Sequence, residues 1–253
     1  MILGYDEAGR GEVLLLVHGF PVDRRIWADQ LTGLADIRRV VAPDLRGRGK
    51  SPSSDTSWTI DSHAEDLAET IRSLGVESVD LAGVSMGGYI AFALLREHPE
   101  LVRSLILVST RAAADAPEYK TGREMTAERA KRFGTRALAA SMIDKLLTPN
   151  APRQVRARVL EMFDSIPGET SAADSLAMRD RADSTEMLRS ILIPTLVIEG
   201  EEEALLPAGS GRVTAETIPG AYLASIPAAG HFAPIENPEE FNARVRMFFA
   251  TTG

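Results

Sequence analysis

The chain of 253 residues contains no cysteine. This absence excludes a disulfide scaffold, a thiolate nucleophile and any metal site with cysteine ligands. No apolar run approaches the roughly 18 residues of a membrane span. The N-terminal stretch MILGYDEAGRGE also lacks the basic and apolar regions of a secretory signal. We therefore expect a cytoplasmic protein without a membrane partner.

Positive charge is also in short supply. The chain has 28 lysine and arginine residues against 36 aspartate and glutamate residues, a net charge of −8. This sign disfavours nucleic acid and anionic membranes as partners, and neutral small molecules fit it better. The hydrophobic share of 44% and the charged share of 25% are those of a globular protein. The length predicts one large domain.

Six short apolar runs predict the strands of one sheet. They are residues 13–17, 40–42, 79–84, 105–109, 195–199 and 222–226. Because these runs are apolar nearly throughout, they indicate strands buried on both faces. Amphipathic helical patterns lie between several of them, and in residues 63–75 the helix is expected to end at Gly75. The alternation predicts an α/β protein with a mostly parallel central sheet and helices on both faces.

Residues 111–190 break this alternation, because they are rich in alanine, arginine and glutamate and contain no convincing strand. The segment is too long for an ordinary loop. It predicts a helical cap inserted over the ligand-binding edge of the sheet. Residues 1–110 and 191–253 would then form the core domain.

A serine lies in a tight glycine-rich turn. Gly83, Ser85 and Gly87 form the pattern G-x-S-x-G between a predicted strand and a predicted helix. Glycine on both sides lets the strand reverse into the helix so sharply that the serine is lifted above the sheet. The N–H groups at the start of the helix then favour negative charge at this spot. A turn of a nucleotide-binding fold is the alternative, but the strand, turn and helix favour Ser85 as a nucleophile.

Four further motifs accompany this turn. They are VHGF at 17–20, APDLRGRGKS at 42–51, VIEGEEEALLP at 197–207 and GHFAPIENP at 230–238. Together the motifs resemble the α/β-hydrolase fold family over nearly the whole chain. Within it, the sequence is most similar to the group of 3-oxoadipate enol-lactonases, small carboxylesterases and cofactor-free haloperoxidases. The resemblance implies that no metal or organic cofactor takes part.

The resemblance also implies the roles of several residues. The family's chain order of nucleophile, acid and histidine implies that His231 is the base. His18 of the VHGF motif would hold its loop so that the backbone N–H of Phe20, with that of Met86, forms an oxyanion hole. We expect His63 and His98 to be surface or capping residues.

The matching acid is Glu203, at a position where relatives carry aspartate. A glutamate reaches about 1.5 Å farther, so the loop must retreat or the hydrogen bond must form at another angle. Triads with glutamate are compatible with this chemistry. Glu202 is the second candidate and Asp115 the reserve, whereas Asp44 is expected to belong to a structural turn near the site.

The sequence thus predicts a serine hydrolase that cleaves an ester or lactone of a small, largely apolar substrate through an acyl-enzyme on Ser85. It would act as a monomer or homodimer. Trp27, Phe92 and Phe232 flank the motifs and are candidates for the pocket wall. Carbon–carbon hydrolysis and perhydrolysis stay open as alternatives. A weakly or non-catalytic ligand-binding protein on a hydrolase scaffold also stays open, because the acid departs from aspartate.

Overall fold

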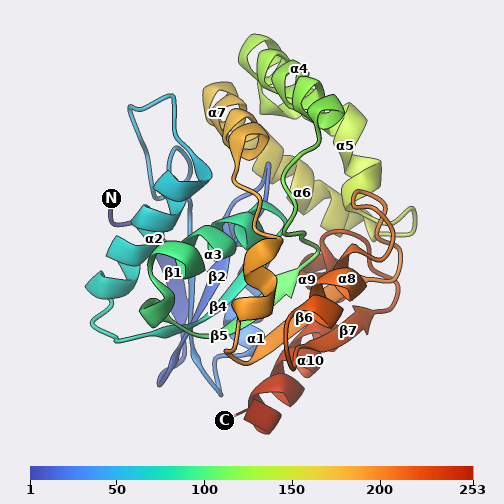
Figure 1. The fold of residues 1–253 in the computed structure, drawn as a ribbon. Coiled ribbons are helices and arrows are strands. Elements are labelled where there is room, and N and C mark those ends of the chain that lie inside the picture. The colour runs from blue at the N-terminus through green and yellow to red at the C-terminus, as the bar shows by residue number, and fades with distance from the viewer. Residues whose placement is uncertain (253) are drawn as a thin grey trace.

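The computed structural model describes residues 1–252, and its centre is a seven-stranded sheet (Figure 1). The strand order is β1-β3-β2-β4-β5-β6-β7. The strands are β1 Tyr5–Ala8, β2 Val13–Val17, β3 Arg39–Pro43, β4 Val79–Val84, β5 Val102–Val108, β6 Thr195–Gly200 and β7 Tyr222–Ile226. Only the pairing of β1 with β3 is antiparallel. The predicted mostly parallel sheet is confirmed.

Helices outside the insertion cover both faces of this sheet (Figure 1). They are η1 Arg24–Trp27, α1 Ala28–Gly33, α2 Ile60–Ser73, α3 Met86–Glu97, η2 Pro99–Leu101, α8 Ser210–Thr217, α9 Ala233–Glu236 and α10 Pro238–Thr252. Helix α2 packs against α3, and α1 packs against α10. No helix in residues 1–252 is long and apolar enough to cross a membrane.

Helix α2 shows how local sequence sets these elements. The Thr59 side chain accepts a hydrogen bond from the Ser62 N–H, and the Ser62 hydroxyl accepts one from the Thr59 N–H, which forms a reciprocal cap. The helix ends before Gly75, whose φ of +72° suits glycine. The predicted helix is confirmed, with a start three residues earlier than residue 63.

The two edge strands differ from expectation. Strand β1 escaped prediction because its sequence YDEA is polar and gives no apolar run. Strand β7 was expected to be buried on both faces, but Tyr222 is 50% exposed and Leu223 is 43% exposed. That expectation is wrong because β7 lies at the end of the sheet, and its apolar residues reflect β propensity rather than full burial.

The insertion between β5 and β6 is helical, as predicted. Its elements are α4 Pro117–Phe133, η3 Thr135–Leu138, α5 Ala139–Leu146, α6 Arg153–Ser165, α7 Gly168–Asp180 and η4 Glu186–Ser190. Helix α4 packs along α7 beyond one end of the sheet (Figure 1). The chain then returns to the core, where η4 packs against α8. We propose residues 111–190 as the cap, with its last ten residues lying against the core.

A buried ionic cluster holds the cap to the core. Asp174 of α7 pairs with Arg48, accepts a hydrogen bond from Trp58 Nε1 at 2.8 Å and lies 3.1 Å from His63 Nε2. Burial opposes the charge of Asp174, but Arg48 and His63 hold its pKa below the ordinary value. The expectation that His63 is a surface or capping residue is wrong. It is fully buried because a cap helix distant in sequence covers it. His98 follows α3, with a side chain 19% exposed.

We predict that Asp174→Asn lowers the free energy of unfolding by about 3–5 kcal/mol, because it leaves the buried Arg48 without its counter-charge. Urea denaturation measures this change. Asp180→Asn is the matched control on the same helix, because the Asp180 side chain is 55% exposed in its pair with Arg179. The control should cost less than about 1 kcal/mol. Equal losses in the two variants would show that the buried cluster does not hold the cap.

Candidate active site

Ser85 lies in the sharp turn between β4 and α3, with φ 55° and ψ −114°. A Cβ at Gly83 would lie 2.4 Å from the Gly87 carbonyl oxygen, and a Cβ at Gly87 would lie 2.3 Å from the Val17 carbonyl oxygen. Both distances are too short for any side chain, so the turn requires glycine at these positions. The Ser85 N–H also donates to the Val108 carbonyl at 2.9 Å. The surrounding backbone therefore holds the serine in a conformation that is strained for a residue with a side chain.

Glu203, after β6, and His231, after β7, are hydrogen-bonded to each other. Glu203 Oε2 lies 2.8 Å from His231 Nδ1. The other oxygen of Glu203 accepts the backbone N–H groups of Leu205 and Leu206 at 2.7 and 3.2 Å. The loop thus accommodates the longer side chain by binding its second oxygen to its own backbone.

The other two acid candidates are placed differently. Glu202 is exposed. The Asp115 carboxylate is bound by the guanidinium groups of Arg111, Arg123 and Arg181. Of the three acids, Glu203 alone is bonded to His231 within the described residues.

The electrostatics suit an ionised acid at position 203. Burial opposes the charge of Glu203, but His231 and the two backbone N–H groups lower its pKa below the ordinary value. When Nδ1–H of His231 donates to this carboxylate, Nε2 carries the lone pair. Nε2 is buried and has no hydrogen-bond partner in residues 1–252. It is the ring atom that can accept a proton.

Gly19 lies close to both the serine turn and the histidine loop. A Cβ built on Gly19 would be 3.1 Å from Ser85 Cβ and 3.7 Å from the Phe232 ring. The ring centroids of Phe232 and His231 are 5.4 Å apart. The fold therefore brings the serine and the histidine loop together beside one glycine, at the carboxyl ends of β4 and β7.

His18 fixes the loop after β2. Its Nε2 accepts the Leu45 N–H at 3.0 Å, which places the ring proton on Nδ1, 2.8 Å from the Gly19 carbonyl. Burial and the charge of Arg48 lower the pKa of His18 to about 4. The N–H group of Phe20, which follows Gly19, and that of Met86, which follows Ser85, donate no hydrogen bond within residues 1–252. Both donors are free for a ligand.

Ser85 opens onto a cavity of about 550 Å³, a size typical of small-molecule sites. Core residues such as Phe20 and Tyr89 form one wall, and Leu205, Leu206 and Pro207 form a second. The insertion supplies the third wall, with Arg111, Asp115, Tyr119, Arg123, Met142 and Lys145 among its residues. This charged wall does not match the largely apolar substrate that the sequence suggested.

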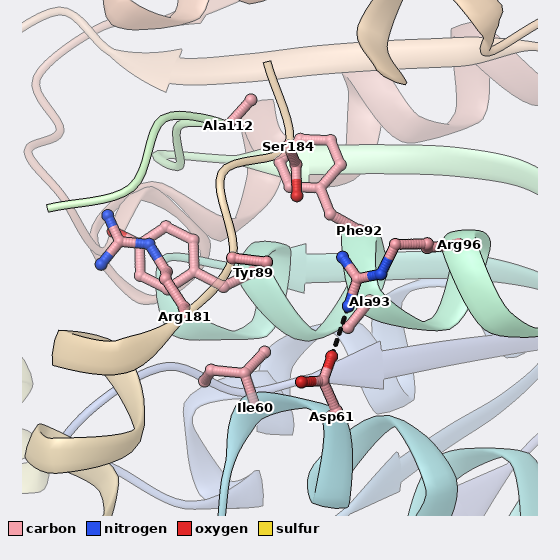
Figure 2. A pocket seen from close by; sticks show the side chains of 10 residues that line it. Ile60, Asp61, Tyr89, Phe92, Ala93, Arg96, Ala112, Arg181 and Ser184 are labelled. Carbon is pink, nitrogen blue, oxygen red and sulfur yellow. Dashed lines mark hydrogen bonds and ion pairs between the residues drawn. The ribbon is translucent and has the colours of Figure 1, made fainter. Parts of the chain in front are cut away.

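The three aromatic residues predicted for the pocket wall do not line this cavity. Trp27 is fully buried and packs against Phe241, with ring centroids 5.9 Å apart. Phe232 packs against His231. Phe92 borders a separate hollow between α3 and residues 181–184, shown in Figure 2. With a volume of about 10 Å³, that hollow has room for one water at most.

Glu236 has a role that the sequence did not reveal, although it lies in the GHFAPIENP motif. Its carboxylate accepts the N–H groups of Gly230, in the histidine loop, and Thr148, in the insertion, at 2.8 and 2.7 Å. The Phe232 N–H also donates to the Leu146 carbonyl at 3.1 Å. The loop that carries His231 is therefore bound to the cap. Asp44 accepts hydrogen bonds from Arg24 and the Lys50 N–H, as expected of a structural turn.

Comparisons with known proteins agree with this fold. Residues 12–238 match a family model described as the alpha/beta hydrolase fold. The structure of a thermophilic esterase from Thermogutta terrifontis, with malate bound, is 38% identical with a TM-score of 0.96, covering 99% of this chain and 93% of the other. The enol-lactonase from Burkholderia xenovorans is 27% identical with a TM-score of 0.88, covering 98% and 96%. A Mycobacterium tuberculosis protein, named as an unproven non-heme bromoperoxidase, is 29% identical over 98% of each chain.

We predict that the protein loses stability as the pH falls from about 6.5 to about 4 through the buried, neutral His18. In this window the unfolded chain takes up a proton at residue 18 and the folded chain does not. The full loss is about 3 kcal/mol. His18→Gln lacks this proton, so the difference in unfolding free energy between wild type and variant should shrink as the pH falls. Parallel stability curves would contradict the assignment.

Proposed function

The chain belongs to the alpha/beta hydrolase fold family, and we propose that it is a serine hydrolase that cleaves a carboxylic ester or lactone through an acyl-enzyme on Ser85. The hydrogen bond between Glu203 and His231 is the observation that carries this proposal. It fixes the imidazole so that its unpartnered Nε2 is the proton acceptor, in a loop that meets the serine turn at Gly19. The esterase and the enol-lactonase among the similar structures support the same chemistry.

The first half of the reaction forms the acyl-enzyme. Ser85 Oγ attacks the carbonyl carbon while His231 Nε2 takes the hydroxyl proton. The N–H groups of Phe20 and Met86 receive the oxyanion, and each such donor is worth about 3 kcal/mol in the transition state. The imidazolium then gives its proton to the leaving alkoxide, and the alcohol departs. Glu203 stabilises the imidazolium without taking its proton.

The second half releases the acid. His231 Nε2 takes a proton from a water molecule, whose oxygen attacks the acyl carbon. The tetrahedral intermediate collapses, and the proton returns to Ser85 Oγ. A lactone follows the same course, except that the leaving hydroxyl stays attached to the acyl chain.

Two rival functions differ from this proposal in their predicted products or reactivity. A perhydrolase would pass the acyl group to hydrogen peroxide instead of water, and formation of a peracid would identify it. This reaction is a rival because one relative carries the bromoperoxidase name. A non-catalytic binding protein was suggested by the glutamate at position 203. The bond from Glu203 to the histidine weakens that reading, because an impaired acid would leave the imidazole unoriented.

We predict that a fluorophosphonate probe adds once to the wild-type protein, because Ser85 is the activated nucleophile. Intact-protein mass spectrometry measures the adduct. Ser85→Ala should abolish labelling together with hydrolysis of p-nitrophenyl acetate. Ser109→Ala is the matched control, since Ser109 is another buried serine with positive φ at the end of a strand. Unlabelled wild-type protein without esterase activity would favour the binding-protein reading.

We predict that Glu203→Gln lowers kcat by about 10³- to 10⁴-fold, because a neutral amide no longer selects the imidazole tautomer. Glu202→Gln, the neighbouring control, should retain activity because its side chain is exposed. Steady-state kinetics measure both effects, and thermal melting checks that each variant folds. If Glu203→Gln kept near-wild-type kcat, the acid would have to be assigned to another residue.

A further inference from the structure

The cavity wall contributed by the insertion carries more positive than negative charge. Arg111, Arg123 and Lys145 line it, and Asp115 is its only acidic lining residue among residues 1–252. The chain as a whole has a net charge of −8. The overall negative charge of the protein repels anions from its surface. The positive wall of this cavity is therefore a local feature that the overall charge does not explain.

Asp115 cannot neutralise the cations around it. Its buried carboxylate contacts three guanidinium groups, those of Arg111, Arg123 and Arg181. One negative charge is in contact with three positive charges, and Asp183 near Arg181 compensates part of the excess. Lys145 adds a further positive charge to the wall. Like charges held this close repel each other, and an anionic ligand would relieve the repulsion.

Arg181 is engaged by the protein through both terminal nitrogens, and only its buried Nε has no hydrogen-bond partner within residues 1–252. Its guanidinium donates to the carbonyls of Met178 and Ala113 as well as to Asp115. Its Cζ lies 4.1 Å from the centroid of the Tyr89 ring. Figure 2 shows Arg181 beside Tyr89, and Arg181 is outside the lining of the main cavity. Arg181 therefore holds Asp115 in place without lining the cavity. Asp115 in turn orients Arg111 and Arg123, which line the cavity.

Those two arginines keep free donors. Arg111 donates to Asp115 through one terminal nitrogen, and its other terminal nitrogen makes no hydrogen bond in the described part of the chain. Arg123 binds Asp115 through Nε, while its terminal nitrogens make no hydrogen bond within residues 1–252. Lys145 forms no ion pair with any described residue. Unpartnered guanidinium donors beside a cavity match a carboxylate, which can accept two N–H groups at once.

We propose that the substrate is an ester or lactone that also carries a carboxylate, and that Arg111, Arg123 and Lys145 bind this carboxylate. The inference rests on the proposed serine hydrolase function and names its substrate class. The carboxylate can belong to the acyl part or to the leaving group, and the cavity borders Ser85 in either case. The preference for neutral, largely apolar substrates expected from the overall charge is replaced by one for anions.

Matched ester pairs test this inference. For the acyl side, the mono-p-nitrophenyl ester of glutaric acid is compared with its methyl ester, following release of p-nitrophenolate. For the leaving-group side, 4-acetoxybenzoate is compared with its methyl ester. In at least one pair, we expect kcat/KM for the anionic ester to exceed that for the neutral ester by about tenfold or more. High salt should reduce this ratio.

Three variants assign the effect to the cavity wall. Arg123→Gln and Lys145→Gln should each lower the ratio of anionic to neutral kcat/KM by about 10-fold or more. Lys145 is exposed, so its variant is expected to fold even if Arg123→Gln does not. Arg132→Gln removes the same charge from an exposed position on α4 outside the cavity lining, and it should leave the ratio unchanged.

The inference and the proposed function fail in different ways. Equal kcat/KM values within both ester pairs, or a ratio unaffected by both cavity variants, would overturn the inference while serine-dependent hydrolysis stands. Absence of all hydrolysis and labelling would overturn the proposed function. Calorimetry of glutarate binding to Ser85→Ala then tests the carboxylate site without turnover. Binding that weakens when Arg123→Gln is added supports the site, and no binding overturns it.

Discussion

The backbone around Ser85 is packed too tightly to admit a side chain at Gly83 or Gly87, and the arrangement of the site depends on this constraint. Carbonyl oxygens lie within 2.4 Å of the positions that a Cβ would take at Gly83 and Gly87. Only glycine therefore permits the sharp turn between β4 and α3. The parallel strands then place every other reactive group at the same edge of the sheet, because the loops after β6 and β7 leave from their carboxyl ends. The tightly packed backbone around the turn holds Ser85 in its strained conformation, at the same edge as the other reactive groups.

Hydrogen bonds between loops convert this shared edge into a defined site. Glu203 orients His231, and Glu236 binds the histidine loop to the insertion. On the other side, Asp174 anchors α7 to Arg48 in the core. The cap is thus attached both beside the histidine loop and at the buried ionic cluster. Its cationic wall is held in a fixed relation to the serine, which is what selection of a charged substrate requires.

Sequence reasoning reached the fold, because the buried strands and the serine turn depend on local patterns, whereas the acid and the histidine were inferred from the resemblance to the family. Apolar runs give the buried strands, and the spacing of Gly83, Ser85 and Gly87 gives the turn. The rest depends on how the insertion is oriented. His63 could not be recognised as buried, since its partner Asp174 lies 111 residues away. Arg111 and Arg123 occur in a highly charged stretch that reads as a solvent-exposed surface. The pocket aromatics were misassigned because proximity to a motif in sequence does not decide which face of a residue meets the cavity.

The most direct measurement is a crystal structure of the fluorophosphonate adduct. The account predicts phosphorus bonded to Ser85 Oγ, with His231 Nε2 within about 3.2 Å of Oγ or of the leaving-group position. It also predicts the phosphonyl oxygen between the N–H groups of Phe20 and Met86, and Glu203 still bonded to Nδ1. An adduct on another residue, or an imidazole remote from the modified serine, would contradict the account.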